Sequence, residues 1–482
     1  MAENSVQHQS DDVAAYRVYK RRWYILATCS LLNFSNGMYW LTFAAIPNET
    51  AEFYHISLRQ VDWFSITYFI VGFVFGFVGI IVIDDVGLRF AIILGAVFNA
   101  IGAILRYLSS LEFILTSSLL DFHHYGYAVA IFGQVLCACS QPFLVFSSTK
   151  LAAFWFSSKE RTKATMVCSM AYPVGYAVFF LISPHVIADS NLHETIPRLL
   201  LATAIPACVG CSMALCGFCS SRPPTPPAPS AEHKTEPFYK GITKVLQNRT
   251  FLALTVTWGS SVGVATAMLS LIPQMLCPFG YPEHDSGVWV SMTIFSGLLG
   301  SVISSSVADR TKRFDEILKV LFASSIVILI WFVQMSTVHN QSILVAISLC
   351  LWGLLSLSQM PISLELGVEV TYPIAEATST GLIRITSQLS GFVMTLIAQS
   401  LETDLPPHLL THSQCKIRKS YPNGTHHMVQ ATAPKDFTYS NIFFISAGTL
   451  GFIGLVVFFH PKTHRYHSEQ RDTERQSLLL EK

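Results

Sequence analysis

The chain has 482 residues, of which 51% are hydrophobic and only 13% are charged. Soluble domains typically carry about 25% charged residues, so this composition excludes an ordinary water-soluble protein and indicates a large surface in contact with lipid. The formal net charge of +1 gives no sign of nucleic-acid binding. The sequence contains no nucleotide-binding loop, metal-ligand cluster or hydrolytic triad, so we expect neither a cofactor nor an enzymatic activity.

The N-terminal segment, residues 1–22, is polar and ends in Tyr19-Lys20-Arg21-Arg22. The apolar run that follows is too long for the core of a secretory signal, and it lacks a small-residue cleavage site. We therefore expect a short polar tail followed by an uncleaved first membrane helix.

A membrane-spanning helix needs about 20 mostly apolar residues. Segments of this kind predict an all-α, polytopic membrane protein with twelve transmembrane helices in two six-helix bundles, 23–219 and 251–460. Residues 220–250 contain Arg222-Pro-Pro-Thr-Pro-Pro-Ala-Pro229, which favours an extended linker between the bundles, and 461–482 form a C-terminal tail. The twelve predicted helices are about 23–46, 63–83, 90–108, 126–149, 164–187, 199–219, 251–276, 287–307, 317–336, 342–366, 376–401 and 438–460.

The basic residues predict the orientation in the membrane. Placing the N-terminus in the cytoplasm puts most of the 31 Lys and Arg residues on the cytoplasmic side, which is the side that basic loops prefer. We expect both tails to be cytoplasmic, in a monomeric multi-pass protein of the plasma membrane or the endosome–lysosome system.

The two predicted halves carry similar loops. Asp84-Asp85-Val86-Gly87-Leu88-Arg89 follows the second helix, and Asp309-Arg310-Thr311-Lys312-Arg313 follows the eighth. A carboxylate at a helix end followed by basic residues thus recurs at equivalent places. Parallel repeats of this kind are typical of secondary transporters built from two related halves.

Asp84-x-x-Gly87-x-Arg89 resembles the loop 2–3 signature of the major facilitator superfamily, although the usual upstream glycine is displaced by one position to Gly79. With five other stretches it resembles solute carrier family 49, the feline leukaemia virus subgroup C receptor-related transporters. The other stretches are Tyr19-Lys-Arg-Arg-Trp23, Gln60-Val-Asp62-Trp63, Gln141-Pro142-Phe143, Leu151-Ala-Ala-Phe-Trp-Phe156 and Tyr372-Pro-Ile-Ala-Glu376.

The resemblance implies a secondary transporter that moves a small organic solute, a cation or a zwitterion, across the lipid bilayer by alternating access. Relatives are associated with choline, haem and other small organic molecules. The alternative is a membrane sensor or receptor that keeps the transporter fold without transporting.

The resemblance also implies a cytoplasmic latch, made of loop charges that stabilise the outward-open state. The alternative is a set of solvated charges, each worth about 0–1 kcal/mol. The assigned residues are Asp84, Gly87 and Arg89, near Glu376 at the start of helix 11, and Asp309 and Arg313, near Glu160 at the start of helix 5.

A substrate site is implied by the same resemblance, which matches Trp40, Gln141 and Gln388 to cavity positions that hold choline-like cations in relatives. An indole face attracts a quaternary ammonium through a cation–π contact, and two neutral amides can bind a hydroxyl or a carbonyl group. The alternative for Trp40 is an anchor at the membrane interface. The residues around Ala265-Thr266 are small where a second aromatic wall would be expected, so the sequence predicts a single aromatic wall.

Arg384 lies four residues before Gln388 and therefore shares its helix face. A lone cation about 12 Å inside a membrane helix needs a partner. We favour an ion pair with Glu365 or Glu369, and the alternative is an anionic group of the substrate. An unpaired Arg384 would repel a simple cation, so we expect a larger or zwitterionic solute rather than choline. Lys150, at the inner end of helix 4, is expected to snorkel to the interface.

The outer loops contain candidate modification sites. Asn423-Gly-Thr425 is the first candidate for glycosylation and Asn48-Glu-Thr50 the second, whereas Asn248-Arg-Thr250 should be cytoplasmic and unmodified. Cys277 and Cys415 are the two cysteines expected outside, where a disulfide is permitted.

The C-terminal tail contains Glu474-Arg-Gln-Ser-Leu478-Leu479, which matches an acidic dileucine sorting signal. Such a signal predicts an endocytic adaptor protein as a partner.

Cys216-Gly-Phe-Cys219 has the spacing of a redox or zinc pair, but it ends an apolar run and the sequence has no second pair. We therefore interpret these thiols as packed or lipid-modified.

Overall fold

The molecule is known from a computed structural model. It describes residues 17–43, 45–111, 125–187, 192–227, 238–281, 283–338, 340–372, 374–406, 416–420, 426–430 and 435–459.

Helices dominate the described residues, and two short antiparallel strand pairs join them near the C-terminus. The first half contains α1 (Arg21–Trp40), α2 (Pro47–Tyr54), α3 (Leu58–Ile81), the π-helix η1 (Val82–Val86), α4 (Leu88–Leu108), α6 (Tyr125–Val145), α7 (Ser147–Trp155), α8 (Arg161–Ile187) and α9 (Leu192–Gly217). The second half contains α10 (Phe238–Gln247), α11 (Arg249–Leu276), the 3-10 helix η3 (Cys277–Phe279), α12 (Glu283–Thr311), α13 (Phe314–Ser336), α14 (Ser342–Ser356), α15 (Gln359–Thr371), α16 (Glu376–Ser400) and α18 (Thr438–Phe458). Strand β1 (Thr403–Asp404) pairs with β4 (Lys435–Asp436), and β2 (Lys416–Ser420) pairs with β3 (His426–Gln430).

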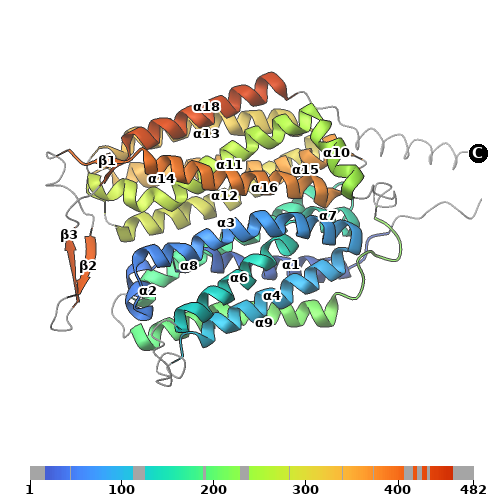
Figure 1. The fold of residues 1–482 in the computed structure, drawn as a ribbon. Coiled ribbons are helices and arrows are strands. Elements are labelled where there is room, and N and C mark those ends of the chain that lie inside the picture. The colour runs from blue at the N-terminus through green and yellow to red at the C-terminus, as the bar shows by residue number, and fades with distance from the viewer. Residues whose placement is uncertain are drawn as a thin grey trace, which may run out of the picture.

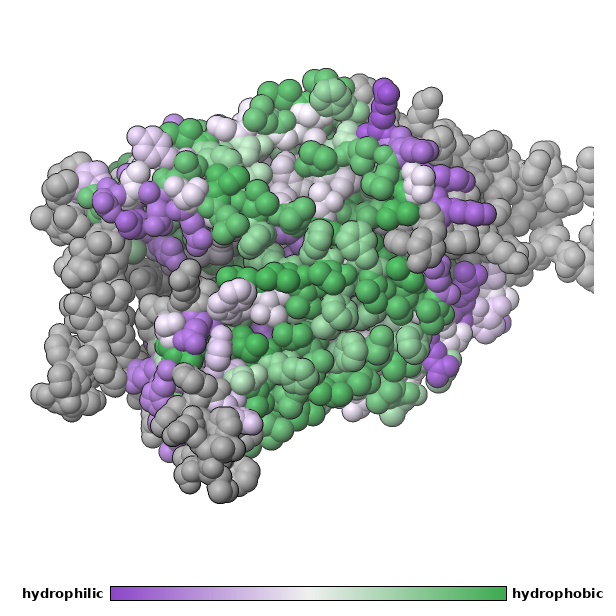
Figure 2. All heavy atoms as spheres, in the orientation of Figure 1, coloured by the Kyte–Doolittle hydropathy of each residue, from purple (hydrophilic) through white to green (hydrophobic). Residues whose placement is uncertain are grey.

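The predicted membrane helices are confirmed. Within the described chain, eleven helical segments are long and apolar enough to cross a membrane. Helix α1, which carries the buried polar residues Asn33, Ser35 and Asn36, completes the twelve. Figure 2 shows the result as an apolar belt between two hydrophilic ends.

Some predicted boundaries are wrong. The first helix ends at Trp40 rather than at residue 46, and the short helix α2 precedes the second membrane helix. That helix begins at Leu58 rather than at residue 63, because Ser57 and Gln60 form a capping box. The fourth and tenth predicted helices are each divided in two, into α6 and α7 and into α14 and α15.

The helices form two layers in Figure 1, with α1 to α9 in one and α10 to α18 in the other. Helix α3 packs against α16, and α8 packs against α12, and these pairs make the main contacts between the halves. Helix α8 also meets α15, and α7 and η1 meet α16. Helix α2 and the strands lie at one end of the molecule, here called the α2 end. Helices α7 and α10 lie at the opposite end, here called the α10 end.

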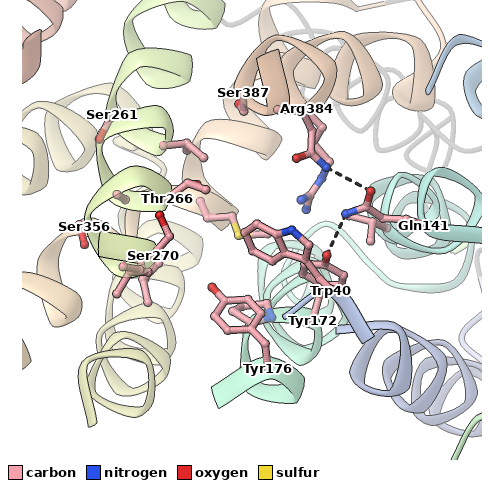
Figure 3. Close-up of a pocket in the computed structure, with 18 of the residues that line it drawn as sticks. Trp40, Gln141, Tyr172, Tyr176, Ser261, Thr266, Ser270, Ser356, Arg384 and Ser387 are labelled. Carbon is pink, nitrogen blue, oxygen red and sulfur yellow. Dashed lines mark hydrogen bonds between the residues drawn. The ribbon is translucent and has the colours of Figure 1, made fainter. Parts of the chain in front are cut away.

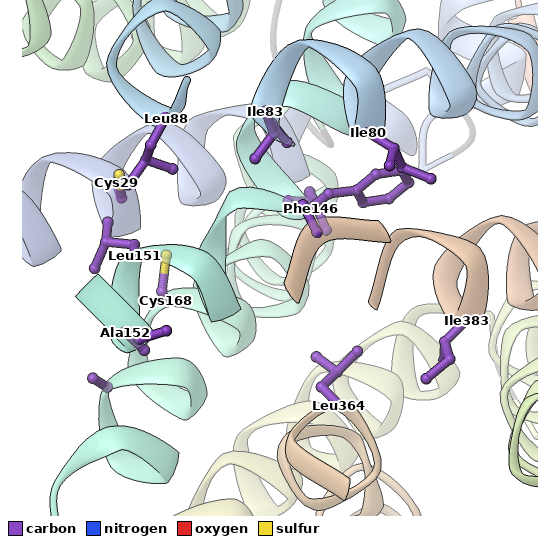
Figure 4. Packing of buried hydrophobic residues seen from close by; sticks show 14 of the residues in the cluster. Cys29, Ile80, Ile83, Leu88, Phe146, Leu151, Ala152, Cys168, Leu364 and Ile383 are labelled. Atoms are coloured by element: carbon purple, nitrogen blue, oxygen red, sulfur yellow. The ribbon is translucent and has the colours of Figure 1, made fainter. Parts of the chain in front are cut away.

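One hydrophobic cluster closes the α10 end across both halves. Ile80, Ile83 and Phe146 of the first half belong to the same buried cluster as Leu364 and Ile383 of the second half. Figure 4 shows these side chains facing one another between the two sets of helices.

Two glycines bring α1 and α8 into backbone contact. A Cβ atom on Gly37 would lie 2.0 Å from the carbonyl oxygen of Tyr172, and one on Gly175 would lie 2.1 Å from that of Phe34. Neither neighbour can move away without shifting a helix, because both are backbone atoms. The crossing therefore fixes α8 against the end of α1 that carries Trp40.

We expect Gly37→Ala to separate α1 from α8 and to lower the free energy of unfolding by at least the roughly 1–3 kcal/mol typical of overpacking. Thermal unfolding of the purified protein in detergent measures the effect. Gly287→Ala in α12 is the matched control, because a Cβ atom there would meet no atom within 4 Å. Equal melting temperatures for the two variants would contradict the close crossing.

Candidate functional site

A cavity of about 150 Å³ lies between the two halves. One water position takes about 10–15 Å³ by the same measure, so the cavity suits a small organic molecule. Figure 3 shows several of its lining side chains. The first half contributes Trp40, Leu41, Gln141, Val145, Phe146, Tyr172, Pro173 and Tyr176; the second contributes Trp258, Ser261, Val262, Ala265, Thr266, Leu269, Ser270, Ser356, Leu357, Met360, Arg384, Ser387 and Gln388.

Aromatic rings form one side of the cavity. Trp40 stacks on Tyr172 with ring centroids 6.3 Å apart and an interplanar angle of 23°. Tyr176 meets Trp40 edge-on at 5.5 Å, and Phe69 meets it edge-on at 5.8 Å. These edge-on and stacked arrangements are favoured by aromatic quadrupoles. Trp40 is therefore part of a cavity wall made of several rings rather than an isolated indole.

The two tyrosines were missed because we sought the second aromatic wall on helix 7. Ala265 and Thr266 of α11 do line the cavity and are small, as predicted. Additional rings come from α8, where Tyr172 and Tyr176 are four residues apart and share one helix face, and Trp258 of α11 also lines the cavity. The spacing of these tyrosines was the available signal.

Two glutamines connect the halves across the cavity. Gln388 of α16 donates from Nε2 to Oε1 of Gln141 of α6 at 3.1 Å. Gln141 in turn donates to the hydroxyl of Tyr172 at 2.9 Å. The predicted residues Trp40, Gln141, Arg384 and Gln388 are thus brought together around one cavity.

Arg384 is the charged residue of this cavity. Its Nε and one terminal nitrogen are buried without a hydrogen-bond partner, and it forms no ion pair with any residue that the structure describes. The expected pair with Glu365 or Glu369 is therefore wrong. Glu365 lies instead close enough to Asp309 of α12 to interact electrostatically.

The cavity is electrostatically one-sided. Its described lining contains Arg384 and no Asp or Glu, and Figure 3 shows the guanidinium pointing from α16 toward Trp40 and Tyr172. A buried cation without a counter-charge is costly, so the site favours a ligand that brings a negative group. The aromatic rings beside it suit a second group that is positive or apolar.

A buried ion pair lies at the α10 end. Lys150 of α7 donates to Asp84 at 2.7 Å and to the carbonyl of Ile83 at 2.9 Å. Thr378, in the first turn of α16, donates to the other carboxylate oxygen of Asp84 at 2.6 Å. Lys150 does not snorkel, because its side chain is only 4% exposed and its charge is neutralised inside the protein.

Asp84 therefore reaches the start of α16, as the proposed latch requires. Glu376 lies within electrostatic range of the Asp84 carboxylate. Gly87 has φ 128°, a conformation that favours glycine, and so allows η1 to turn into α4. The side chain of Arg89 is exposed, and its backbone N–H donates to Ser221 at 3.1 Å.

The second predicted latch is arranged differently. Asp309 lies near Thr162 and Lys163 at the start of α8. Its carboxylate oxygens are buried without a hydrogen-bond partner, and the Lys312 ammonium lies 3.9 Å from one of them. Lys312 donates to the carbonyl of Ser158 across the halves at 3.1 Å. Two of the predicted latch residues form ion pairs within their own halves and not across them. Glu160 pairs with Arg22 at 2.7 Å, and Arg313 pairs with Glu316 at 3.2 Å.

The remaining predicted residues belong to the candidate modification and sorting sites. Asn48 lies in the first turn of α2, just after its Pro47. Cys277 is disulfide-bonded. Cys415, Asn423, Glu474, Leu478 and Leu479 lie outside the described residues.

Comparison with known proteins assigns the family. The family model of the Major Facilitator Superfamily matches residues 26–395. Solute carrier family 49 member A3 of Danio rerio is 34% identical over 461 residues, covering 95% of this chain and 92% of that protein. The choline/ethanolamine transporter flvcr2a of Danio rerio is 27% identical over 400 residues, covering 80% of this chain and 81% of that protein.

The fold is also found among solved structures. The transporter FucP, crystallised in its outward conformation, superposes with a TM-score of 0.65 at 13% identity, covering 92% of this chain and 100% of that chain. This chain is therefore a membrane transporter of the Major Facilitator Superfamily. Within that superfamily it belongs to solute carrier family 49.

Proposed function

We propose that this transporter carries a small zwitterionic or cationic organic solute by alternating access. The observation that carries the proposal is the cavity lined from both halves, with a ring cluster on one half and an unpaired guanidinium on the other. A site between two halves changes its access when the halves rock about it. The closed α10 end corresponds to a state that excludes the cytoplasm, under the orientation predicted from the basic loops.

The contacts at the α10 end support a gate there. Asp84 with Thr378, Thr149 with Thr380 at 2.9 Å, and Lys312 with the Ser158 carbonyl all join the halves. Each must separate before a solute can leave the cavity toward that end. They are therefore the bonds that we expect to break during transport.

The chemistry of the cavity favours a zwitterion. Trp40, Tyr172 and Tyr176 suit an ammonium or apolar group, Gln141 and Gln388 suit a hydroxyl or carbonyl, and a carboxylate would neutralise Arg384. Relatives are named choline/ethanolamine transporters, and both compounds are ammonium alcohols without an anionic group. Arg384 is the reason to expect a different solute here.

The alternative is a sensor that binds the same solute without moving it. Comparing labelled uptake and metabolite pools in cells with and without the protein separates the two. Uptake of a zwitterion above background supports the transporter, whereas binding without any flux favours the sensor. Robust flux of choline would contradict the preference for zwitterions.

We expect Trp40→Ala to weaken solute binding by roughly 30-fold, because a desolvated cation–π contact is worth about 2 kcal/mol. Trp40→Phe should retain part of the affinity. Trp63→Ala is the control, because Trp63 is a 48% exposed residue of α3 away from the cavity. Concentration-dependent uptake measures all three, and an unchanged KM in Trp40→Ala would exclude Trp40 from the site.

We also propose that the loop between α16 and α18 faces outward, carries a glycan on Asn423 and is joined through Cys415 to Cys277. Asn423→Gln should abolish the gel shift caused by glycosidase, and Asn48→Gln should leave most of it. Asn248 should carry no glycan, because it caps α11 by accepting from the N–H of Phe251 and donates to the carbonyl of Val370. A full shift in Asn423→Gln would contradict the assignment.

A further inference from the structure

The C-terminal end of α9 presents two thiols that neither the cavity nor the gate uses. Cys216 and Cys219 are free and exposed, whereas the other free cysteines of the described chain are buried or half-buried. Cys216 lies in the last turn of α9, and Cys219 lies two residues beyond its end. The two sulfurs are thus accessible where the helix leaves the apolar belt.

The thiols continue a lipid-facing strip of α9. Leu201, Ile205 and Val209 are 41%, 56% and 47% exposed and succeed one another every four residues. Cys216 follows Val209 by seven residues, or about two helical turns, and therefore lies on the same face. Side chains exposed on this face of a membrane helix meet hydrocarbon rather than water.

Basic side chains mark the membrane boundary at the same level. Arg21 donates to the carbonyl of Gly217 at 2.6 Å, and Tyr24 donates to that of Met213 at 2.9 Å. The start of α1, with its basic residues, therefore packs beside the end of α9. This end lies with α7 and α10 in Figure 1, which is the cytoplasmic end under the predicted orientation.

We propose that Cys216 and Cys219 are S-acylation sites that carry long-chain fatty acyl groups. The cysteine sulfur attacks the carbonyl carbon of a fatty acyl-coenzyme A thioester, and the bond from that carbon to the coenzyme sulfur breaks. Coenzyme A leaves as a thiol with the proton from cysteine, so no electrons are exchanged. The new acyl chain can lie along the strip formed by Val209 and Ile205. Cysteines at the cytoplasmic border of a membrane helix are typical acceptors.

Hydroxylamine cleaves thioesters, so hydroxylamine-dependent capture of the full-length protein from cell membranes tests the proposal. We expect capture of the wild type, a reduction by about half in Cys216→Ser or in Cys219→Ser, and its loss in the double variant. Cys208→Ser with Cys211→Ser is the matched control, because these half-buried thiols lie deeper on the same helix, and it should leave capture unchanged.

Three results would overturn the proposal. They are failure to capture the wild type, capture of the double variant as strong as that of the wild type, and reaction of the two thiols with maleimide only after reduction. The last result would identify a disulfide between Cys216 and Cys219. The first and last are measured on the wild type, so they hold even if a variant fails to fold.

Discussion

Asp84→Asn should slow transport and lower the free energy of unfolding by roughly 3–5 kcal/mol, because it leaves the Lys150 ammonium buried without its partner. The side chains of Asp84 and Lys150 are only 2% and 4% exposed. The substitution also weakens the contact with Thr378, which joins the halves at the α10 end. Solute uptake and thermal unfolding in detergent measure the two effects separately.

Two further variants distinguish the ion pair from the latch. Asp84→Asn combined with Lys150→Met removes both charges and should recover most of the lost stability. Thr378→Val keeps the pair and should alter mainly the rate of transport. Breaking the exposed ion pair between Arg313 and Glu316, whose side chains are 69% and 61% exposed, is the control. Normal uptake by Asp84→Asn would exclude the latch, and an unchanged melting temperature would exclude the buried pair.

Arg384→Gln should affect different solutes in opposite directions. A solute whose carboxylate pairs with Arg384 should lose roughly 2–5 kcal/mol of binding, or about 30-fold to several thousandfold in affinity. A simple organic cation should bind more tightly, because a repulsive charge is removed. Competition of unlabelled zwitterions and cations against a labelled solute measures both changes.

Ser387→Ala provides the control for this reversal. Ser387 lines the same cavity, and its hydroxyl donates to the carbonyl of Ile383 within its own helix. Its loss should therefore change the affinity for either solute only slightly. If Arg384→Gln weakened zwitterions and cations equally, Arg384 would be a structural residue rather than one that selects the solute.

Hydropathy was enough to predict the membrane helices, because a membrane-spanning segment must hydrogen-bond its backbone polar groups within a helix and present apolar side chains to the lipid. It did not predict where helices break. The division between α6 and α7 at Phe146 lies where an apolar stretch meets the polar residues Ser147 to Lys150. These polar side chains are buried like the apolar ones before them, so neither burial nor the change in hydropathy marks the position as the end of a helix.

The site was predicted in part. Trp40, Gln141, Arg384 and Gln388 were named from the resemblance and the shared helix face, and they do surround one cavity. Tyr172 was not predicted: its spacing from Tyr176 puts both rings on one helix face, but the sequence does not show that this face of α8 turns toward Trp40. The partner of Lys150 was missed for a related reason, since Asp84 lies 66 residues away along the chain.

Ion pairs were the least predictable feature. Glu160 was expected to face Asp309 and Arg313, but Arg22 reaches it first, from the start of α1. Many loop charges of both signs lie at the same end of the molecule, and the sequence does not show which of these side chains lie closest to one another. For Arg384 the sequence predicted an ion pair that does not form. The guanidinium faces a cavity whose described lining contains neutral residues and neither Glu365 nor Glu369 of α15.

The crossing at Gly37 and Gly175 joins α1 and α8 backbone to backbone, so the three rings that they carry must move as a rigid body with the first half. Arg384 belongs to α16 and must move with the second. Under the alternating access proposed above, the separation between the rings and the guanidinium is the length that would change as the halves rotate. A solute with a positive and a negative group would span that length, and its own dimensions would decide which orientation of the halves it stabilises. Selectivity in this transporter would then depend on the distance between two charges of the solute as well as on their identity.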